Sequence, residues 1–118
     1  MGGRMGSGNI IRQNVYLGHN FQIGNHNIIS VGCVIGGFLR TGDLNFFGFQ
    51  VTSSGFRMIG DECLIGMGSV LTRDVPSYTK VYGNPAVAHG THEDTGVIID
   101  EYSALKKWKG SADGKNNR

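Results

Sequence analysis

The sequence predicts an all-β fold: a parallel β-helix of about three to four short coils, followed by an irregular C-terminal tail. Aliphatic residues recur every six positions between residues 17 and 71, and a small residue follows each repeat position. The chain has 118 residues and contains 20 glycines, well above the average usage of about 7%. An α-helix would need an apolar spacing of about 3.6 and would tolerate this much glycine badly. Short strands joined by tight turns fit both observations.

The first position of each hexapeptide is expected to form the core. It is Leu or Ile in seven of its ten occurrences, and the small residue after it is glycine in seven of ten. The ten core positions are Leu17, Ile23, Ile29, Ile35, Thr41, Phe47, Ser53, Ile59, Ile65 and Leu71. Three hexapeptides should complete one triangular coil, so residues eighteen apart should lie above one another. The glycines are expected to adopt backbone conformations that a Cβ would penalise.

The middle of the repeat region departs from the aliphatic pattern. Thr41 and Ser53 occupy core positions there, and Phe46, Phe47 and Phe49 crowd one turn. We expect these aromatic side chains to pack in the core or against a second protomer rather than to stack on a ligand.

The two cysteines, Cys33 and Cys63, each precede a core position by two residues and are expected to be buried small hydrophobes. They lie thirty residues apart, which is not a multiple of eighteen. They should therefore lie on different faces of the coil and not form a disulfide. No CxxC pair occurs, so we expect a reducing, cytoplasmic setting.

The repeat region and its exit loop are predicted to span residues 9–88. Residues 1–8, "MGGRMGSG", have no apolar core and are predicted to be a disordered leader rather than a signal peptide. Pro76 and Pro85 should end the regular coiling. Residues 89–118 are predicted to hold a lone strand at 95–100, a short helix at 100–108 and a disordered tail.

Charge and hydropathy argue against two classes of partner. The formal net charge of +2 gives no reason to expect nucleic acid or an anionic membrane as the main partner. No apolar run approaches the roughly 18 residues that a membrane span requires. A short solenoid exposes unpaired edges and buries little core alone. We therefore expect a homo-oligomer, a trimer packed side to side.

Two motifs carry a family resemblance. The stretch that begins at residue 59 reads "IGDECLIGMGSVLTRDVPSYTKVYGNPA" and combines the patterns IGxGSVxTxDVP and xGNPA. Upstream, "LGHNFQIG" resembles the GHD-x-x-IG segment of bacterial acetyltransferases that modify amino-sugar nucleotides and sialic acid. Together these stretches resemble the hexapeptide-repeat acyltransferases over roughly residues 9–88. The resemblance implies a left-handed parallel β-helix and acyl transfer.

The resemblance also implies a catalytic site. In that family the histidine of the upstream segment, His19 here, is the general base, and an amide one coil above it binds the thioester carbonyl. Eighteen residues beyond His19 is Gly37, and further steps of eighteen reach Gly55 and Arg73. A coenzyme A molecule along this column would have its thioester at His19 and Gly37. Its pantetheine arm would lie along the glycines, and its phosphates would lie near Arg73.

A second column of the family corresponds to Phe49 and Met67, which are also eighteen apart. The adjacent protomer would close the groove along which the coenzyme lies. The implied co-substrate is acetyl-CoA, with no metal ion. The implied reaction is direct transfer to a hydroxyl or amine of a small acceptor such as a sugar or sugar nucleotide.

Two departures from the family keep other hypotheses open. Asn20 replaces the acidic residue that follows the family's histidine, and an amide can orient an imidazole but cannot stabilise its charge. Ile28 stands where the family has a second histidine, so His26 is expected to be a surface turn residue. One alternative is therefore a non-catalytic trimeric scaffold that binds a ligand without turning it over. Zinc hydratases resembling the gamma class of carbonic anhydrases are a weaker alternative, because residue 24, where their second histidine would fall, is glycine.

Overall fold

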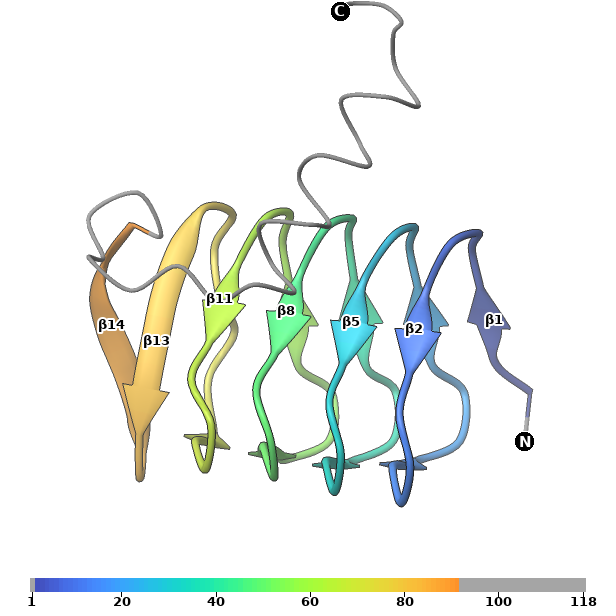
Figure 1. Cartoon of the computed structure of the whole chain (residues 1–118), viewed down its shortest axis with the longest axis horizontal. Coiled ribbons are helices and arrows are strands. Elements are labelled where there is room, and N and C mark those ends of the chain that lie inside the picture. Colours follow the sequence, from blue (N-terminus) through green and yellow to red (C-terminus); the bar gives the residue numbers. More distant parts are fainter. Residues whose placement is uncertain (1, 92–118) are drawn as a thin grey trace, which may run out of the picture.

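The computed structural model describes residues 2–91, which wind as a row of parallel coils with three flat faces (Figure 1). Sheet A contains β1 (Arg4–Met5), β4 (Gln22–Ile23), β7 (Arg40–Thr41) and β10 (Met58–Ile59). Sheet B contains β2 (Ile10–Ile11), β5 (Ile28–Ile29), β8 (Phe46–Phe47), β11 (Leu64–Ile65), β13 (Thr79–Gly83) and β14 (Ala86–Thr91). Sheet C contains β3 (Tyr16–Leu17), β6 (Val34–Ile35), β9 (Thr52–Ser53) and β12 (Val70–Leu71).

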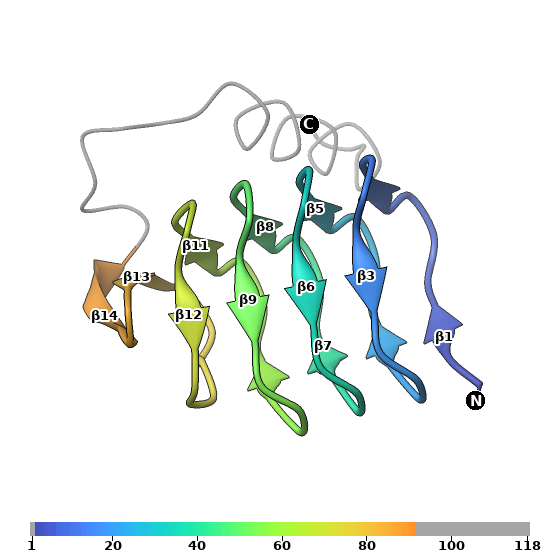
Figure 2. The ribbon, with the colours of Figure 1, turned by 90° about the horizontal axis from the view of Figure 1, so that it is seen from below.

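The register of the strands confirms the predicted coil of eighteen residues. On sheet C, Leu17 lies opposite Ile35, Ile35 opposite Ser53, and Ser53 opposite Leu71, all in parallel pairs. Figure 2 shows the four strands of this sheet side by side. The all-β fold and the parallel β-helix are therefore as predicted, with about four coils between Arg4 and Val75.

The turns adopt a left-handed backbone conformation once in every hexapeptide. Between Gly8 and Gly68, the residues with φ between 53° and 80° follow one another at intervals of six: Gly8, Asn14, Asn20, His26, Gly32, Phe38, Leu44, Gln50, Phe56, Glu62 and Gly68. Only three of these are glycine, although glycine adopts this conformation most readily. The expectation that the repeat glycines serve positive φ is therefore wrong.

Space, rather than backbone conformation, explains the repeat glycines. A Cβ on Gly18 would lie 2.4 Å from the amide nitrogen of Gly37, one coil above. A Cβ on Gly36 would lie 2.6 Å from the amide nitrogen of Gly55. Carbon atoms cannot approach backbone this closely, so these glycines are needed for the coils to stack.

The core follows the predicted positions. Ile29, Ile35, Phe47 and Ile65 are fully buried in one cluster, and Phe47 is thus a core residue, as expected. The polar residues at core positions are satisfied locally, since the Ser53 hydroxyl donates to the carbonyl of the next residue at 2.9 Å. Thr41 does the same at 3.2 Å.

An asparagine ladder fills one interior edge. The side-chain oxygen of Asn27 accepts a hydrogen bond from the backbone N–H of Asn45, and that of Asn45 accepts one from the N–H of Cys63, each at 2.8 Å. Their side-chain amides donate to the carbonyls of Gly42 and Gly60 at 3.0 and 2.8 Å. Both asparagines are fully buried. Their paired hydrogen bonds offset the cost of burying polar groups.

The structured region extends beyond the predicted boundaries. Arg4 and Met5 form β1, which pairs with β4, so part of the predicted leader 1–8 belongs to the first coil. At the other end, β13 and β14 pair as an antiparallel hairpin, with the cis peptide Asn84–Pro85 in its turn. The strand predicted at 95–100 and the helix predicted at 100–108 lie outside the described residues.

Both cysteines are free, fully buried thiols, as predicted. Cys33 donates to the carbonyl of Gly48 and Cys63 to the carbonyl of Pro76, each at 3.1 Å. Burial raises the pKa of both thiols. Among the described residues, no helix is long and apolar enough to cross a membrane.

Candidate functional site

His19 lies in the turn that leads from sheet C to sheet A. This turn and those stacked on it, at residues 18–21, 36–39 and 54–57, are called the His19 corner. Because β3, β6 and β9 are paired in exact register, the residues that follow them are also stacked. Gly37 thus lies one coil above His19, and Gly55 lies above Gly37, as the count of eighteen predicts.

The backbone and the ring of His19 both contact the coil above. Its carbonyl accepts a hydrogen bond from the N–H of Phe38 at 2.9 Å. Its exposed imidazole meets the Phe38 ring edge-on, with ring centroids 5.1 Å apart and an interplanar angle of 83°. A Cβ on Gly37 would lie 3.5 Å from both Cε1 and Nε2 of the imidazole. His19 therefore extends along the corner toward Gly37.

Gly37 and Gly55 differ from the repeat glycines because a Cβ there would be tight but would need only a small shift of the neighbouring backbone. A Cβ at either residue would come no closer than 3.2 Å to another group. Neither residue has a positive φ. The coil geometry therefore does not require glycine at these two positions, unlike at Gly18 and Gly36. The two bare positions expose backbone above His19.

The amides of this corner are also left uncovered. Within residues 2–91, the N–H groups of Gly37 and Gly55 donate no hydrogen bond. The next corner, which joins sheet A to sheet B, is different. There the N–H of Asn25 donates to a carboxylate oxygen of Asp43 at 2.8 Å, and the N–H of Asp43 donates to Asp61 at 2.7 Å. Side chains thus satisfy that corner, while in the His19 corner the N–H groups of Gly37 and Gly55 remain available.

Two aromatic residues of the His19 corner were not singled out from the sequence. Phe38 and Phe56 both have left-handed backbone conformations, with φ of 61° and 64°, which is uncommon for bulky residues. Their rings are stacked, 4.7 Å apart and 3° from parallel. Phe56 is 67% exposed. The signal that could have identified them is their position, eighteen apart and directly after the two bare glycines.

Arg73 lies two residues after the end of β12, as Gly55 lies two residues after the end of β9. The coil that begins at β10 is, however, shorter than the others. Ile59 pairs with Val75, sixteen residues on, and Ile65 pairs with Val81 at the same separation. The spacing of eighteen that the sequence count uses therefore ends at Leu71. Arg73 is exposed at this shortened turn. Next to it in sequence, Asp74 forms an ion pair with Arg57 at 3.7 Å.

The second predicted column lies elsewhere on the chain. Phe49 and Met67 occupy the corner that joins sheet B to sheet C, and they are 45% and 69% exposed. Sheet C separates them from His19. A single chain therefore does not bring the two columns together.

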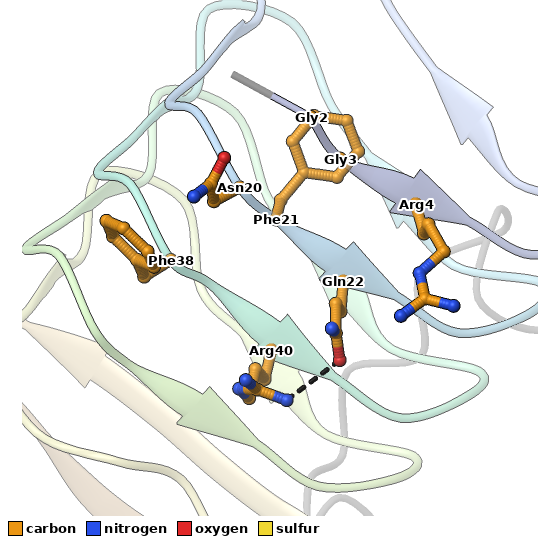
Figure 3. Close-up of a pocket in the computed structure, with 8 residues that line it drawn as sticks. All are labelled: Gly2, Gly3, Arg4, Asn20, Phe21, Gln22, Phe38 and Arg40. Atoms are coloured by element: carbon orange, nitrogen blue, oxygen red, sulfur yellow. Dashed lines mark hydrogen bonds between the residues drawn. The ribbon is translucent and has the colours of Figure 1, made fainter.

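A hollow of about 330 Å³ adjoins the His19 corner on the outer face of sheet A (Figure 3). Asn20 and Phe38 form its edge at the corner. Its floor crosses β1, β4 and β7, where Arg4, Gln22 and Arg40 point outward.

A metal centre has no support in the described part of the chain. Among residues 2–91, no three His, Cys, Asp or Glu side chains are grouped so that they could hold a metal ion. His26 lies on the corner between sheets A and B, away from His19, with a left-handed backbone at φ 58°.

Comparison with known proteins identifies relatives of the chain, although no protein-family model matches it. It is 30% identical, over 107 residues, to an acyl-[acyl-carrier-protein]–UDP-N-acetylglucosamine O-acyltransferase of Ectopseudomonas mendocina. The match covers 87% of this chain and 42% of the relative. The chain thus spans about two fifths of the length of this relative.

Two solved structures share the fold. Serine acetyltransferase of Neisseria gonorrhoeae, in complex with serine, superimposes with a TM-score of 0.69 at 30% identity and covers 72% of this chain and 39% of its own. A hexapeptide-repeat-containing acetyltransferase of Vibrio cholerae gives a TM-score of 0.73 at 22% identity, over 78% of this chain and 64% of its own. The latter likeness concerns the fold alone.

The repeat of six, the three-sided β-helix and these matches agree with one another. The chain is a homologue of the hexapeptide-repeat acyltransferases, and it has the left-handed β-helix that they share.

Proposed function

We propose that the protein transfers an acyl group, in the first place acetyl, from coenzyme A to a hydroxyl or amine of a small acceptor. The observation that carries this proposal is the contrast among the glycines of the His19 corner. A Cβ at Gly37 or Gly55 would need only a small shift, whereas one at Gly18 or Gly36 would clash, and the N–H groups of Gly37 and Gly55 are not used by the described residues. Two unused N–H groups above a histidine suit a thioester carbonyl.

In the proposed reaction, His19 is the general base. A ring nitrogen of His19 accepts the proton of the acceptor as its oxygen or nitrogen attacks the thioester carbon. General-base help of this kind contributes on the order of 10² to 10⁴-fold. The tetrahedral intermediate collapses with cleavage of the carbon–sulfur bond, and the imidazolium returns the proton to the departing thiolate. No covalent enzyme intermediate is needed.

Gly37 supplies the oxyanion contact in this scheme. Its N–H would donate to the carbonyl oxygen as negative charge develops, an effect worth about 3–4 kcal/mol in other acyl-transfer enzymes. The Phe38 ring at 5.1 Å restricts the imidazole to the side that faces Gly37. This contact can help to orient the imidazole but does not supply the negative charge that is lost with Asn20 in place of an acidic residue.

The coenzyme would continue along the His19 corner. Its pantetheine arm passes Gly55, and its phosphates reach the exposed guanidinium of Arg73. Because Phe49 and Met67 lie on another corner, they can line the same groove only from a second copy. The proposed enzyme is therefore a homotrimer with the groove between protomers. Its two free thiols suit a reducing compartment such as the cytoplasm.

Calorimetric titration of the purified protein with acetyl-CoA tests the proposal. We expect about one site per protomer with micromolar affinity, near −8 kcal/mol, and a loss of at least about tenfold in Arg73→Glu. Lys80→Glu on sheet B is the matched charge-reversal control and should bind as the wild type does. Absence of binding would refute the transferase and leave the non-catalytic scaffold as the function to pursue.

A further inference from the structure

We infer that the acceptor carries an anionic group, a carboxylate or a phosphate, which binds to Arg4 and Arg40 in the hollow on sheet A. The inference rests on the proposed acyl transfer and names the class of molecule that receives the acyl group. It concerns a surface that neither the His19 column nor the coenzyme groove uses.

The hollow is built by three neighbouring coils. Gly2, Gly3 and Arg4 line it from the first coil, residues 20–22 from the second, and Phe38 and Arg40 from the third. Adjacent strands lie about 4.8 Å apart, so the two arginines, which lie two strands apart on β1 and β7, flank β4 at roughly 10 Å. A carboxylate or phosphate between them can meet both guanidinium groups (Figure 3).

The charges of the hollow are unbalanced. It has two arginines and no acidic residue in its lining. Within residues 2–91, the Arg4 side chain forms no ion pair or hydrogen bond. Arg40 donates through Nη1 to the neutral Oε1 of Gln22 at 2.8 Å. Arginine binds planar oxyanions through paired donors, so an anion would supply the missing charge.

The Arg40–Gln22 contact also orients a third donor. Because the Gln22 oxygen accepts from Arg40, its amide nitrogen is left to donate, and no described residue accepts from it. The floor of the hollow therefore presents donors from three consecutive coils. The opposite arrangement occurs at the next corner, where Asp43, Asp61 and Glu62 line a separate hollow of about 260 Å³. The positive character of the sheet A hollow is thus local.

The hollow lies within reach of His19. Phe38 lines the hollow and also contacts the imidazole edge-on. Gln22 is three residues from His19, a path of about 10 Å at most in extended chain. A molecule of hexose size can therefore place its anionic group between the arginines and its hydroxyl or amine at the imidazole.

The test is an NMR titration of the full chain with glucose 6-phosphate, glucuronate and glucose. We expect the Arg40 Nε–H, the Gln22 side-chain amide and the Phe38 backbone amide to shift with the two anionic sugars and not with glucose. Glucose 6-phosphate and glucuronate separate a phosphate site from a carboxylate site. In Arg40→Gln the anion affinity should fall at least about tenfold, which is about 1.4 kcal/mol.

Two further variants guard against a folding artefact. Gln22→Glu keeps both arginines but places a carboxylate between them, and it should abolish anion binding while the circular dichroism spectrum stays unchanged. Lys80→Gln removes a cation from sheet B and should leave the anion shifts intact. Equal shifts with glucose, or equal loss of anion binding in Lys80→Gln, would overturn the inference.

Acetyl-CoA titration of the same variants separates this inference from the proposed function. Arg40→Gln and Gln22→Glu should bind acetyl-CoA as the wild type does. Acetyl-CoA binding without selective anion binding would overturn the anionic acceptor and leave acyl transfer standing. Selective anion binding without acetyl-CoA binding would overturn the transferase, and with it the anion's role as an acceptor.

Discussion

Replacing Gly55 with alanine should impair the coenzyme groove while leaving the β-helix folded. The new Cβ would lie 3.2 Å from the carbonyl oxygen of Gly37 and 3.8 Å from its amide nitrogen. It would therefore stand over the N–H that the proposed mechanism directs at the thioester carbonyl. The backbone of Gly55 is outside the left-handed region, so alanine introduces no backbone strain.

The effect on stability should be small because two contributions oppose each other. Glycine to alanine at a compatible backbone position stabilises by about 0.4–1 kcal/mol through the unfolded chain. The contact at 3.2 Å needs a shift of a few tenths of an ångström and removes part of that gain. The net change should stay within about 1 kcal/mol, a shift in Tm of less than about 8 °C.

The effect on function should be larger. Loss of one oxyanion donor costs about 10² to 10³ in kcat, or roughly 2.7–4 kcal/mol. A methyl group 3.8 Å from the nitrogen screens the donor without removing it. We therefore expect kcat to fall by at least about tenfold, toward the lower end of the loss that complete removal of the donor would cause. The assays are acetyl-CoA affinity by calorimetry and release of the CoA thiol with a reactive acceptor.

Gly36→Ala is the matched control. Its Cβ would meet the Gly55 nitrogen at 2.6 Å and the Gly55 Cα at 2.9 Å, so this variant should lose stability by about 1–3 kcal/mol. Wild-type binding and turnover of acetyl-CoA by Gly55→Ala would contradict the proposed role of the Gly37 N–H. Equal stability of Gly36→Ala and Gly55→Ala would contradict the difference between the two glycines that the distances imply.

Three further predictions address the base, the interior ladder and the thiols. His19→Ala should lower kcat by about 10² to 10⁴-fold with little change in acetyl-CoA affinity, whereas His26→Ala on another corner should keep the wild-type rate; initial-rate measurements decide. Asn45→Ala leaves the buried N–H of Cys63 without its acceptor, whereas the Gly60 carbonyl still accepts from the N–H of Gly42. Urea unfolding should therefore show a loss of about 1–3 kcal/mol, and a loss below about 1 would contradict the ladder's role. Because burial raises the pKa of Cys33 and Cys63 above 9.0, iodoacetamide at pH 8 should alkylate them only after denaturation. Rapid alkylation of the native protein would contradict the burial of the two thiols. The contribution of the two thiols to stability is complete below the ordinary thiol pKa and falls as the pH rises above it, since the thiols of the unfolded chain then ionise first.

The sequence alone predicted the coil and the column above His19. In a β-helix each hexapeptide is a short strand and a turn, so counting along the chain also counts position in space. The spacing of eighteen therefore placed Gly37 and Gly55 above His19 and kept Cys33 and Cys63 apart. Such accuracy is unusual for contacts distant in sequence, and it arises because the strands pair in exact register.

Other features depend on distances between coils, which the repeat does not encode. The sequence shows glycine at residues 36 and 37 alike, but only the stacked backbone reveals that one is required by space and the other is not. The two-residue shortening after Leu71 and the stacked rings of Phe38 and Phe56 likewise appear only in three dimensions.

The sequence by itself therefore determined the fold and the stacking of residues along each edge, because a regular repeat turns local spacing into tertiary position. Only the tertiary structure decided which groups are accessible. The repeat already separates Phe49 from His19, but only the structure shows that the Phe49 side chain is exposed rather than part of the core. Arg4 and Arg40 are thirty-six residues apart, so the repeat stacks them, but only the structure shows that they share a hollow with no acidic residue in its lining. Accessibility and charge balance depend on what packs around each side chain, and no period in the sequence specifies that.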